Sequence, residues 1–401
     1  MKSIDQLKKT ENETLRTFDE EIPSLLFSHE DDIAFENYLK NYKNFYINNL
    51  KFPPEMFRNK SLIDFGAGAG SNSLCLASWG AKCTLVELSA KSLSLAEEVF
   101  KKRLKSIKDH RFINSSIFDF NEKELYDIVH CRAVLSHTAG KELAFKKIIK
   151  LVSKDGYFIY GDPNKAGGFQ NMLQRYLIYK FSKNDKDIVK YAELFFKNDI
   201  DRSQNAVVRT RNQIIYDRWV IQSQDDPSFK EVCNWINESG LKLYSTYPSN
   251  PDFFITDSFY NKDKIDFSKI HNISVLSEIL WMIKTEDDKD SVSKIEDNLS
   301  DVGKSFAQLT SYVANCNKST EIKTKEFNEY SDEFVKSINN IEFLKKLNDK
   351  LKLFINESKQ LIEIVNKGDF EKVRSFIENC SLLFKGPCGI RHIDFIAYKE
   401  N

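Results

Sequence analysis

Residues 61–70 constrain what this 401-residue chain can fold into more than any other segment. They read Ser-Leu-Ile-Asp-Phe-Gly-Ala-Gly-Ala-Gly, so a short apolar stretch ends in Asp64, and a helix-forming run follows over residues 74–79. Three glycines alternate between them: Gly66, Gly68 and Gly70. Because glycine has no Cβ, a strand that turns into a helix through such residues lets its backbone approach a ligand closely. The segment therefore predicts a ligand-binding turn at the carboxyl end of a strand.

The glycine spacing differs from the G-x-G-x-x-G turn of dinucleotide-binding enzymes. Counted from Gly66, the third glycine of that pattern would fall on Ser71. One β-α-β unit later, segment 81–87 reads as the next strand and ends in Glu87. A carboxylate there can accept hydrogen bonds from two hydroxyl groups at once, as a ribose presents them. The turn combined with Glu87 is a much stronger signal than a glycine triplet alone.

The pattern D-x-G-x-G-x-G over residues 64–70, followed by Glu87, resembles motif I of the class I S-adenosylmethionine-dependent methyltransferases. In that family the glycine loop lies under the amino-acid part of the cofactor, and the second acidic residue binds the ribose hydroxyls. The resemblance covers about residues 50–250 and a terminal strand, and it implies S-adenosyl-L-methionine as the cofactor. The cofactor-binding residues that it implies are Asp64, Gly66, Ala67, Gly68, Gly70, Glu87, Leu88, Ser116, Ile117, Asp119 and Arg132.

One position departs from the family pattern. Members of the family commonly carry an acidic residue just after the third strand, where it holds the adenine amine. In this chain the expected position is Ser116, and Asp119 follows three residues later. Two interpretations stay open: either Asp119 reaches the adenine amine, or Ser116 and the neighbouring backbone hold it less strongly.

Two residues are candidates for catalysis. The loop after the fourth strand, residues 132–138, ends in a His-Thr pair, as it does in many small-molecule methyltransferases of the resembled family. His137 is a candidate general base because imidazole titrates near cellular pH. Alternatively, His137 orders the loop by hydrogen bonding. Asp162, at the end of the fifth strand, is the second candidate, and it either faces the substrate or orders its own loop.

Substrate recognition is expected from the loop after the fifth strand and from the long segment 169–228. In the first, Asn164 lies in a polar, glycine-rich sequence. In the second, Tyr216 and Asp217 belong to a mixture of Arg, Tyr, Asp and Trp that suits a polar or anionic substrate. The same composition also fits a solvated helical cap with an aromatic underside.

Strand-like and helical segments alternate between residues 61 and 247, which predicts an α/β fold with a doubly wound, mainly parallel sheet. The predicted strands are 61–65, 82–87, 111–114, 126–131, 157–162 and 241–247, with a turn at 154–156 before the fifth. The expected helices are 71–79, 89–104, 141–152 and 229–239, the last ended by Gly240. Ligands of such folds bind at the carboxyl ends of the strands.

The resembled family usually closes its sheet with a seventh, antiparallel strand, and nothing strand-like closely follows Tyr247. Residues 386–398 have a glycine-rich approach and then apolar alternation, so they predict that strand. Residues 262–384 contain no proline and only two glycines, which predicts a helical insertion before the last strand of a seven-stranded sheet. The alternative is an independent helical domain whose terminal strand pairs with nothing.

The predicted organisation therefore has four parts. These are an N-terminal helical extension or cap (1–52), a methyltransferase core domain (53–250), a helical insertion (251–385) and the final strand of the core sheet (386–401). The extension carries aromatic residues at helical spacing, which either dock on the sheet or cap the active site. Pro53 and Pro54 mark its end.

Charge and cysteine content narrow the functional class. Lys+Arg and Asp+Glu each total 59, and a formal net charge of zero argues against nucleic acid as the main partner. The first 25 residues lack the apolar segment of a signal peptide, and no run approaches the roughly 18 apolar residues of a membrane span. The seven cysteines are scattered without a C-x-x-C pair, which indicates reduced core residues and no metal site. A cytoplasmic protein is expected.

The expected function is transfer of the methyl group of S-adenosyl-L-methionine to a small biosynthetic metabolite, at an oxygen, nitrogen or carbon atom. A second interpretation is a methyltransferase that acts on RNA or protein and docks its substrate on the helical insertion. A third is a non-catalytic protein that retains the fold and binds a partner, although an intact glycine turn with Glu87 argues against it. The insertion also offers a surface through which copies of the chain could form a homo-oligomer.

Overall fold

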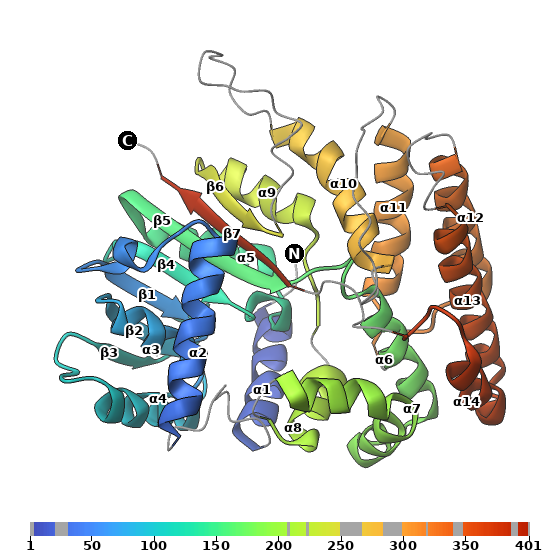
Figure 1. The fold of residues 1–401 in the computed structure, drawn as a ribbon, viewed down its shortest axis with the longest axis horizontal. Helices are drawn as coiled ribbons and strands as arrows, with labels where there is room; N and C mark the ends of the chain where they lie inside the picture. Colours follow the sequence, from blue (N-terminus) through green and yellow to red (C-terminus); the bar gives the residue numbers. More distant parts are fainter. Residues whose placement is uncertain are drawn as a thin grey trace.

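The computed structural model describes residues 4–20, 31–206, 209–221, 224–248, 267–283, 299–317, 320–339, 348–385 and 392–399. In Figure 1 a twisted sheet with its flanking helices occupies one half of the molecule, and a group of helices occupies the other half. The sheet carries the predicted ligand-binding edge.

The described strands form one seven-stranded sheet in the order β3-β2-β1-β4-β5-β7-β6. All neighbouring pairs from β3 to β5 are parallel, and β7 pairs antiparallel with both β5 and β6. The strands are β1 (Ser61–Phe65), β2 (Lys82–Glu87), β3 (Arg111–Asn114), β4 (Tyr126–Arg132), β5 (Val152–Pro163), β6 (Lys242–Tyr247) and β7 (His392–Tyr398). The predicted doubly wound, mainly parallel sheet is confirmed.

The fifth strand is longer than the sequence predicted. The expected turn at residues 154–156 lies inside β5 as an irregularity, where the register with β4 shifts between Tyr126 and Ile128. Asp155 adopts a left-handed conformation with φ of 59°, and its N–H donates to the Lys399 carbonyl at 3.1 Å. The segment therefore keeps the turn-like backbone that its sequence indicates, but pairing with the chain end keeps it within the sheet.

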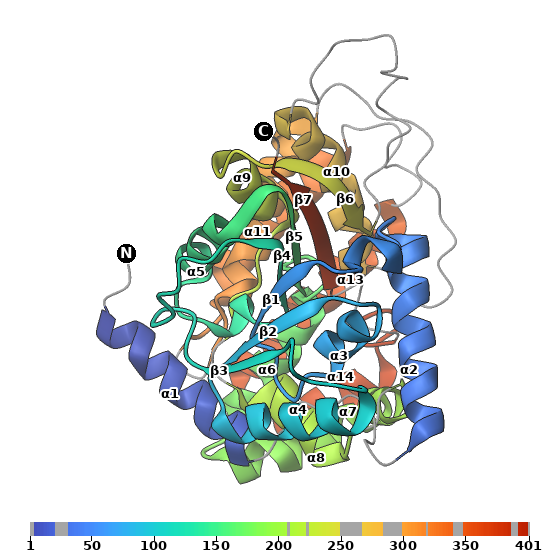
Figure 2. The same cartoon turned by 90° about the vertical axis from the view of Figure 1, so that its left-hand side faces the viewer.

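Helices cover both faces of the sheet, as Figures 1 and 2 show. One face packs against α3 (Ser71–Ser78), α4 (Ala90–Arg103) and the N-terminal α2 (Asp32–Asn44), which continues into a π-helical turn (Phe45–Asn49). The other face packs against α5 (Lys141–Ile148) and α9 (Phe229–Glu238). Because both faces are covered, the central strands carry buried apolar residues on both faces, as expected for a parallel sheet. Short 3₁₀ segments lie at Pro54–Phe57, Leu135–His137 and Ile149–Leu151.

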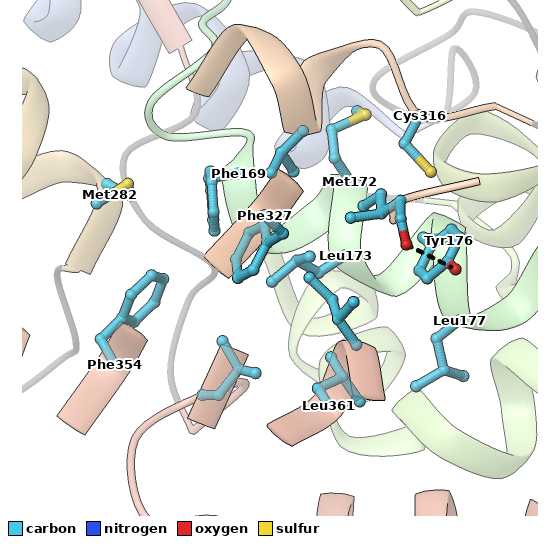
Figure 3. Packing of buried hydrophobic residues seen from close by; sticks show 14 of the residues in the cluster. Phe169, Met172, Leu173, Tyr176, Leu177, Met282, Cys316, Phe327, Phe354 and Leu361 are labelled. Atoms are coloured by element: carbon cyan, nitrogen blue, oxygen red, sulfur yellow. Dashed lines mark hydrogen bonds between the residues drawn. The ribbon is translucent and has the colours of Figure 1, made fainter. Parts of the chain in front are cut away.

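The other half of the molecule is helical and has its own hydrophobic core. It combines α6 (Phe169–Phe181), α7 (Asp185–Ala206), α8 (Arg211–Ile215) and the π-helical Tyr216–Val220 with α10 (Phe267–Ile283), α11 (Leu299–Ala314), α12 (Thr324–Asn339), α13 (Asn348–Lys367) and α14 (Phe370–Asn379). Figure 3 shows side chains of α6 against those of α12 and α13. The Tyr176 hydroxyl donates to the Ile322 carbonyl at 3.4 Å within this core.

This second core crosses the predicted boundary near residue 250. Residues from Ala166 to Val220, which precede β6, share one hydrophobic cluster with residues from Val275 to Leu383, which follow it. Arg175 of α6 is fully buried and donates to the carbonyls of Arg218 (2.8 Å) and Ile221, so α6 is fixed on the helical side. The helical half is thus built from two insertions into the sheet, whereas the sequence predicted only the later one.

The terminal strand lies where the sequence placed it. β7 inserts between β5 and β6, with Tyr160 opposite Phe395 and Thr246 opposite Phe395 on the other side. The alternative of a terminal strand without a partner is therefore wrong. The glycine-rich approach at residues 386–391 lies outside the described residues, as does part of the predicted insertion.

Six cysteines are described, and all are buried and free: Cys75, Cys83, Cys131, Cys233, Cys316 and Cys380. The expectation of reduced core cysteines holds for these six. Among the described helices, none combines the length and the apolarity that crossing a bilayer requires.

Glu278 links the helical half to the sheet half, and burial of its carboxyl group disfavours the charged form. It lies on α10, is buried, and accepts a hydrogen bond from the backbone N–H of Phe229 at the start of α9 (3.2 Å). Burial raises the pKa of Glu278 to about 7. A carboxyl group with a raised pKa favours the folded state most at low pH, and that contribution is lost as the pH rises through the folded-state pKa.

From pH 5 to pH 8 the wild type should lose free energy of unfolding, because its buried Glu278 must ionise. The free energy of unfolding of Glu278→Gln, relative to that of the wild type, should therefore rise by about 2 kcal/mol over this pH range. Urea unfolding of both proteins at the two pH values measures the difference. The exposed Glu333 of α12 supplies the control, since Glu333→Gln should track the wild type at both pH values. An equal stability difference at both pH values would contradict the expectation.

Candidate active site

The glycine turn between β1 and α3 is tied to the end of β2. The N–H of Gly66 donates to the Val86 carbonyl at 2.8 Å, and the N–H of Gly68 donates to Oε2 of Glu87 at 2.8 Å. Gly66 has φ of +66°, and a Cβ there would lie 2.3 Å from Cγ2 of Val134. The turn therefore requires glycine at this position, and it brings the loops after β1, β2 and β4 together at one edge of the sheet.

Glu87 ends β2 beside this turn, as the sequence predicted. Its second oxygen, Oε1, accepts the N–H of Ser89 at 2.9 Å. Burial raises the pKa of Glu87, while the hydrogen bonds from Ser89 and Gly68 oppose that rise. Two carboxylate oxygens offer about four acceptor positions, so the two backbone bonds leave capacity for the two hydroxyls of a ribose. Glu87 thus orders the turn and remains able to bind a ligand.

Asp64 lies in β1 just before the turn, and its side chain contacts residues of α3 and β4. Its side chain is buried, accepts the Ser73 hydroxyl, and lies 2.7 Å from Nδ1 of His130. These two partners favour a supporting role for the Asp64 carboxylate, and the expected cofactor contact of Asp64 stays a prediction. The sequence analysis missed His130, although the residue faces Asp64 across the β1–β4 pair and is the one ionisable residue in an otherwise apolar part of β4.

The loop after β3 holds three predicted cofactor residues. Ser116 and Ile117 are buried, and the Ser116 hydroxyl accepts the N–H of Asp119 at 3.0 Å. Asp119 itself is exposed and forms an ion pair with Lys8 of α1 (Ile4–Glu20) at 3.2 Å. The first of the two interpretations for the adenine amine is therefore disfavoured, because the Asp119 carboxylate points outward to a lysine.

Arg132 lies at the carboxyl end of β4, on the face that α2 covers. Its guanidinium carbon is 5.0 Å from the centre of the Phe45 ring and 5.9 Å from that of Tyr42. Stacking of this kind holds the guanidinium group in place while its edge remains a donor of hydrogen bonds.

The predicted cofactor set near the turn also includes Ala67, Gly70 and Leu88. The N–H of Gly70 donates to the Ala67 carbonyl at 3.0 Å within the turn.

Asp162 is a predicted candidate for catalysis, and its contacts favour the alternative in which it orders its own loop. It is fully buried, and its carboxylate accepts hydrogen bonds from the N–H groups of Leu135 (3.0 Å) and Ser136 (3.2 Å), the Ser136 hydroxyl (2.7 Å) and the Tyr160 hydroxyl (2.9 Å). Burial raises its pKa to about 6 despite these donors. A carboxylate enclosed in this way shapes the loop after β4 and has no open side for a substrate.

His137 lies at the end of the loop that Asp162 holds. Its carbonyl accepts the Thr14 hydroxyl of α1 at 3.4 Å, and its ring packs edge-on against Phe18 at 6.0 Å between centres. The ring is partly exposed. His137 therefore remains at the edge of the site, where the sequence placed it.

The three predicted substrate residues each contact other parts of the protein. Asn164 is buried and accepts the N–H of Gly167 at 2.9 Å, so it orders the loop after β5. Asp217 forms an ion pair with Arg209 at 3.0 Å, and Tyr216 packs against the helical core. These contacts favour structural roles for Asn164 and Tyr216, and they leave Asp217 at the partly exposed border of the helical half.

The structure adds one segment that the sequence analysis missed. Residues 224–228 close over the loop after β4, where the N–H of Asp225 donates to the Ser136 carbonyl at 2.8 Å. Lys141 joins the two segments through an ion pair with Asp225 (2.8 Å) and a hydrogen bond to the Asp226 carbonyl (3.1 Å). No local sequence pattern predicts these contacts, because the partners are more than 80 residues apart in the chain.

A cavity of about 320 Å³ lies elsewhere, between α5 and the loop that joins β3 to β4. Phe65, Ile117 and Phe120 line it, whereas the glycine turn and Glu87 do not. Within the described ranges, no group of three or more His, Cys, Asp or Glu side chains is placed to hold a metal ion.

Comparisons with known proteins agree with this geometry. Residues 57–218 match the family model described as a methyltransferase domain. The ubiquinone biosynthesis O-methyltransferase of Rickettsia akari (strain Hartford) is 20% identical over 175 residues, which cover 42% of this chain and 68% of that protein. The enzyme of the same name from Nitrosomonas europaea is 27% identical over 106 residues, 26% of this chain and 45% of that protein. This chain thus spans less than half of the second relative.

Solved structures include magnesium protoporphyrin IX methyltransferase from Synechocystis PCC 6803 with bound SAH, at a TM-score of 0.35 and 14% identity, covering 60% of this chain and 87% of that one. The matched family model, the strand order and the glycine turn with Glu87 identify residues 57–218 as a methyltransferase domain. This domain resembles those of the class I S-adenosylmethionine-dependent methyltransferases.

The residues present fit the cofactor of that class. The glycine turn offers a surface without side chains, and the conformation of Gly66 keeps it so. Glu87 retains acceptor capacity for the ribose hydroxyls, and Arg132 is a fixed cation beside the turn, suited to the carboxylate of the methionine part. When bound, the cofactor would supply a sulfonium-activated methyl group, and the residues of the turn with Glu87 and Arg132 would hold it.

Proposed function

We propose that this protein transfers a methyl group from S-adenosyl-L-methionine to a small biosynthetic metabolite. The observation that carries the proposal is the position of Glu87, whose carboxylate both accepts the Gly68 N–H of the glycine turn and stands at the carboxyl end of β2. A nucleoside bound there by its ribose lies along the sheet edge, with its amino-acid part above the turn.

The proposed acceptor site lies where β4 and β5 end, facing the helical half. Asp162 fixes the loop of residues 135–137, and residues 224–228 cover that loop from the outside. Enclosure by these segments would exclude water and align an acceptor with the methyl group, which accounts for much of what such an enzyme must do. His137, partly exposed on the same loop, is the proposed acceptor of a proton from a hydroxyl or amine substrate.

A small molecule is the proposed substrate class. The two curated relatives are named as O-methyltransferases of ubiquinone biosynthesis, which favours a small molecule and an oxygen acceptor for this chain too. The zero net charge also disfavours nucleic acid, and the scattered cysteines fit a cytoplasmic enzyme. RNA or protein as the acceptor is the competing outcome of the experiment below.

The experiment uses the full chain and two readouts. Calorimetry with S-adenosylhomocysteine should show binding. Methyl-labelled S-adenosyl-L-methionine, incubated with the protein and with metabolite, RNA and protein fractions from a cell that lacks it, should then transfer label only to the metabolite fraction. Label in RNA or protein would overturn the substrate class. A chain that binds no S-adenosylhomocysteine would overturn the proposed function as a whole.

A further inference from the structure

The cavity between α5 and the loop that joins β3 to β4 has an apolar floor. This floor consists of the buried lining residues Phe65, Ile117, Phe120 and Ile148. Leu125 belongs to the lining as well, and 53% of its surface is exposed. Pockets that bind small molecules are mostly apolar and measure about 300 to 1,000 Å³, so a volume of about 320 Å³ suits one small ligand.

Three lysines form the rim of this cavity. Lys123 and Lys150 are exposed, whereas Lys147 of α5 is half-buried and its ammonium group donates to the Phe118 carbonyl. Within the described part of the chain, none of the three forms an ion pair with a carboxylate. The rim therefore carries positive charge that no acidic side chain neutralises at contact distance.

Glu122 is the one acidic side chain among the described residues that line the cavity. Its carboxylate lies 2.6 Å from Nη2 of Arg111, and Nη1 of the same arginine lies 3.0 Å from the Glu124 carboxylate. Arg111 does not line the cavity. The charge of Glu122 is thus already paired outside the lining, so the three lysines make the rim attractive to an anion.

The environment of Lys147 gives a further reason to expect an anion. Burial lowers the pKa of the Lys147 ammonium group, although the charges of Asp119 and Glu11 oppose that shift. Partial burial removes water from the charged form of a lysine. An anionic group at contact distance would stabilise the charge that burial disfavours.

The floor and the rim together select one class of ligand. A neutral apolar molecule would cover the floor but would make no use of the lysines, and a small hydrophilic anion would leave the floor in contact with water. A molecule with an apolar body and one carboxylate satisfies both parts. Its body removes the floor from water, and its carboxylate accepts charge-assisted hydrogen bonds from the ammonium groups.

We propose that this cavity is a second ligand site, which binds a small amphipathic carboxylate with its apolar body on the floor and its carboxylate at the rim lysines. Phe65 directly precedes Gly66, and Ile117 lies in the loop after β3. The occupant would therefore contact two segments that also belong to the proposed cofactor site. The inference does not depend on the proposed function, because it uses neither the glycine turn nor Glu87.

The test is calorimetry on the full chain, without cofactor, with three probes: octanoate, octan-1-ol and acetate. Octan-1-ol has the apolar chain of octanoate without its charge, and acetate has the charge without the chain. We expect octanoate to bind about tenfold more tightly than octan-1-ol, and acetate to show no binding at the same concentrations. Higher ionic strength should weaken the binding of octanoate but not that of octan-1-ol, because the rim charges are partly exposed.

Two double variants locate the effect. Lys123→Gln combined with Lys150→Gln should lower the affinity for octanoate about fivefold and keep the affinity for octan-1-ol, which shows that the fold and the floor are intact. Lys105→Gln combined with Lys108→Gln changes the net charge equally, at exposed lysines that do not line the cavity. This control should bind octanoate as the wild type does.

A wild type that binds octanoate no more tightly than octan-1-ol would overturn the inference. An unchanged octanoate affinity in the rim variant would overturn it too, as would an equal loss in the control, because net charge and not the rim would then be responsible. None of these outcomes affects the proposed function, whose own test is the binding of S-adenosylhomocysteine.

Discussion

Replacement of Glu87 by alanine is expected to weaken the binding of S-adenosylhomocysteine by one to two orders of magnitude, as the loss of charge-assisted hydrogen bonds to the ribose predicts. The structure adds a second reason. Glu87 also accepts the N–H groups of Gly68 and Ser89, so its removal releases the glycine turn from the end of β2. Calorimetric titration of the purified variant measures the effect.

Two further variants separate these contributions. Glu87→Gln keeps an oxygen for one backbone N–H but loses the charge and one acceptor, so its affinity should fall between those of the wild type and Glu87→Ala. Glu98→Ala removes an exposed carboxylate of the neighbouring α4 and should bind as the wild type does. Wild-type affinity in Glu87→Ala would show that the ribose contact is wrongly assigned.

The second large effect is expected at Asp162. Asp162→Ala leaves the buried donors of Leu135, Ser136 and Tyr160 without an acceptor, and it should lower the free energy of unfolding by about 3 kcal/mol or more. Asp162→Asn retains the size and one acceptor oxygen, so it should lose roughly half as much. Urea unfolding at pH 7.5 measures both variants.

The same pair of variants distinguishes the structural role of Asp162 from the catalytic one. If Asp162 shapes the loop, Asp162→Asn should keep most of its methyl-transfer rate once it is folded and saturated with cofactor. A general base would instead lose roughly a hundredfold or more in rate with little loss of stability. That second pattern would contradict the role that the burial of Asp162 indicates.

Much of the core could be predicted because its signals are local. Strands β1, β2 and β3 begin and end at the predicted residues, and the seventh strand was found from its apolar alternation. The glycine turn and Glu87 were found for the same reason, since the strand, turn and next strand lie within 30 residues of sequence. A position that needs a left-handed backbone, such as Gly66, selects glycine, so this requirement is visible in the residue type.

The roles of charged residues were less predictable. Asp64 and Asp162 both end strands at the predicted edge, and the sequence could not tell a ligand-facing carboxylate from a buried one. The difference depends on partners such as His130 and Ser136, which approach from other strands and loops. Burial and hydrogen-bond partners are tertiary properties, so an acidic residue at a strand end predicts a place more reliably than a role.

The sequence also could not show which helices belong to the helical half. Helices α6–α8 and α10–α14 each have an apolar side, and composition alone allowed the earlier group to belong to the sheet domain. Only packing shows that Leu173 and Phe354 share one core, although about 180 residues separate them.

By itself, the sequence determined the sheet, the turn between β1 and α3, the acidic end of β2 and hence the class of cofactor, because these depend on periodicity and on backbone geometry over short stretches. The tertiary structure decided which carboxylates are enclosed, which helices form the second core, and that α1 lies over the loops after β2, β3 and β4. Contacts of that kind join residues about a hundred positions apart through side chains whose direction no local pattern encodes.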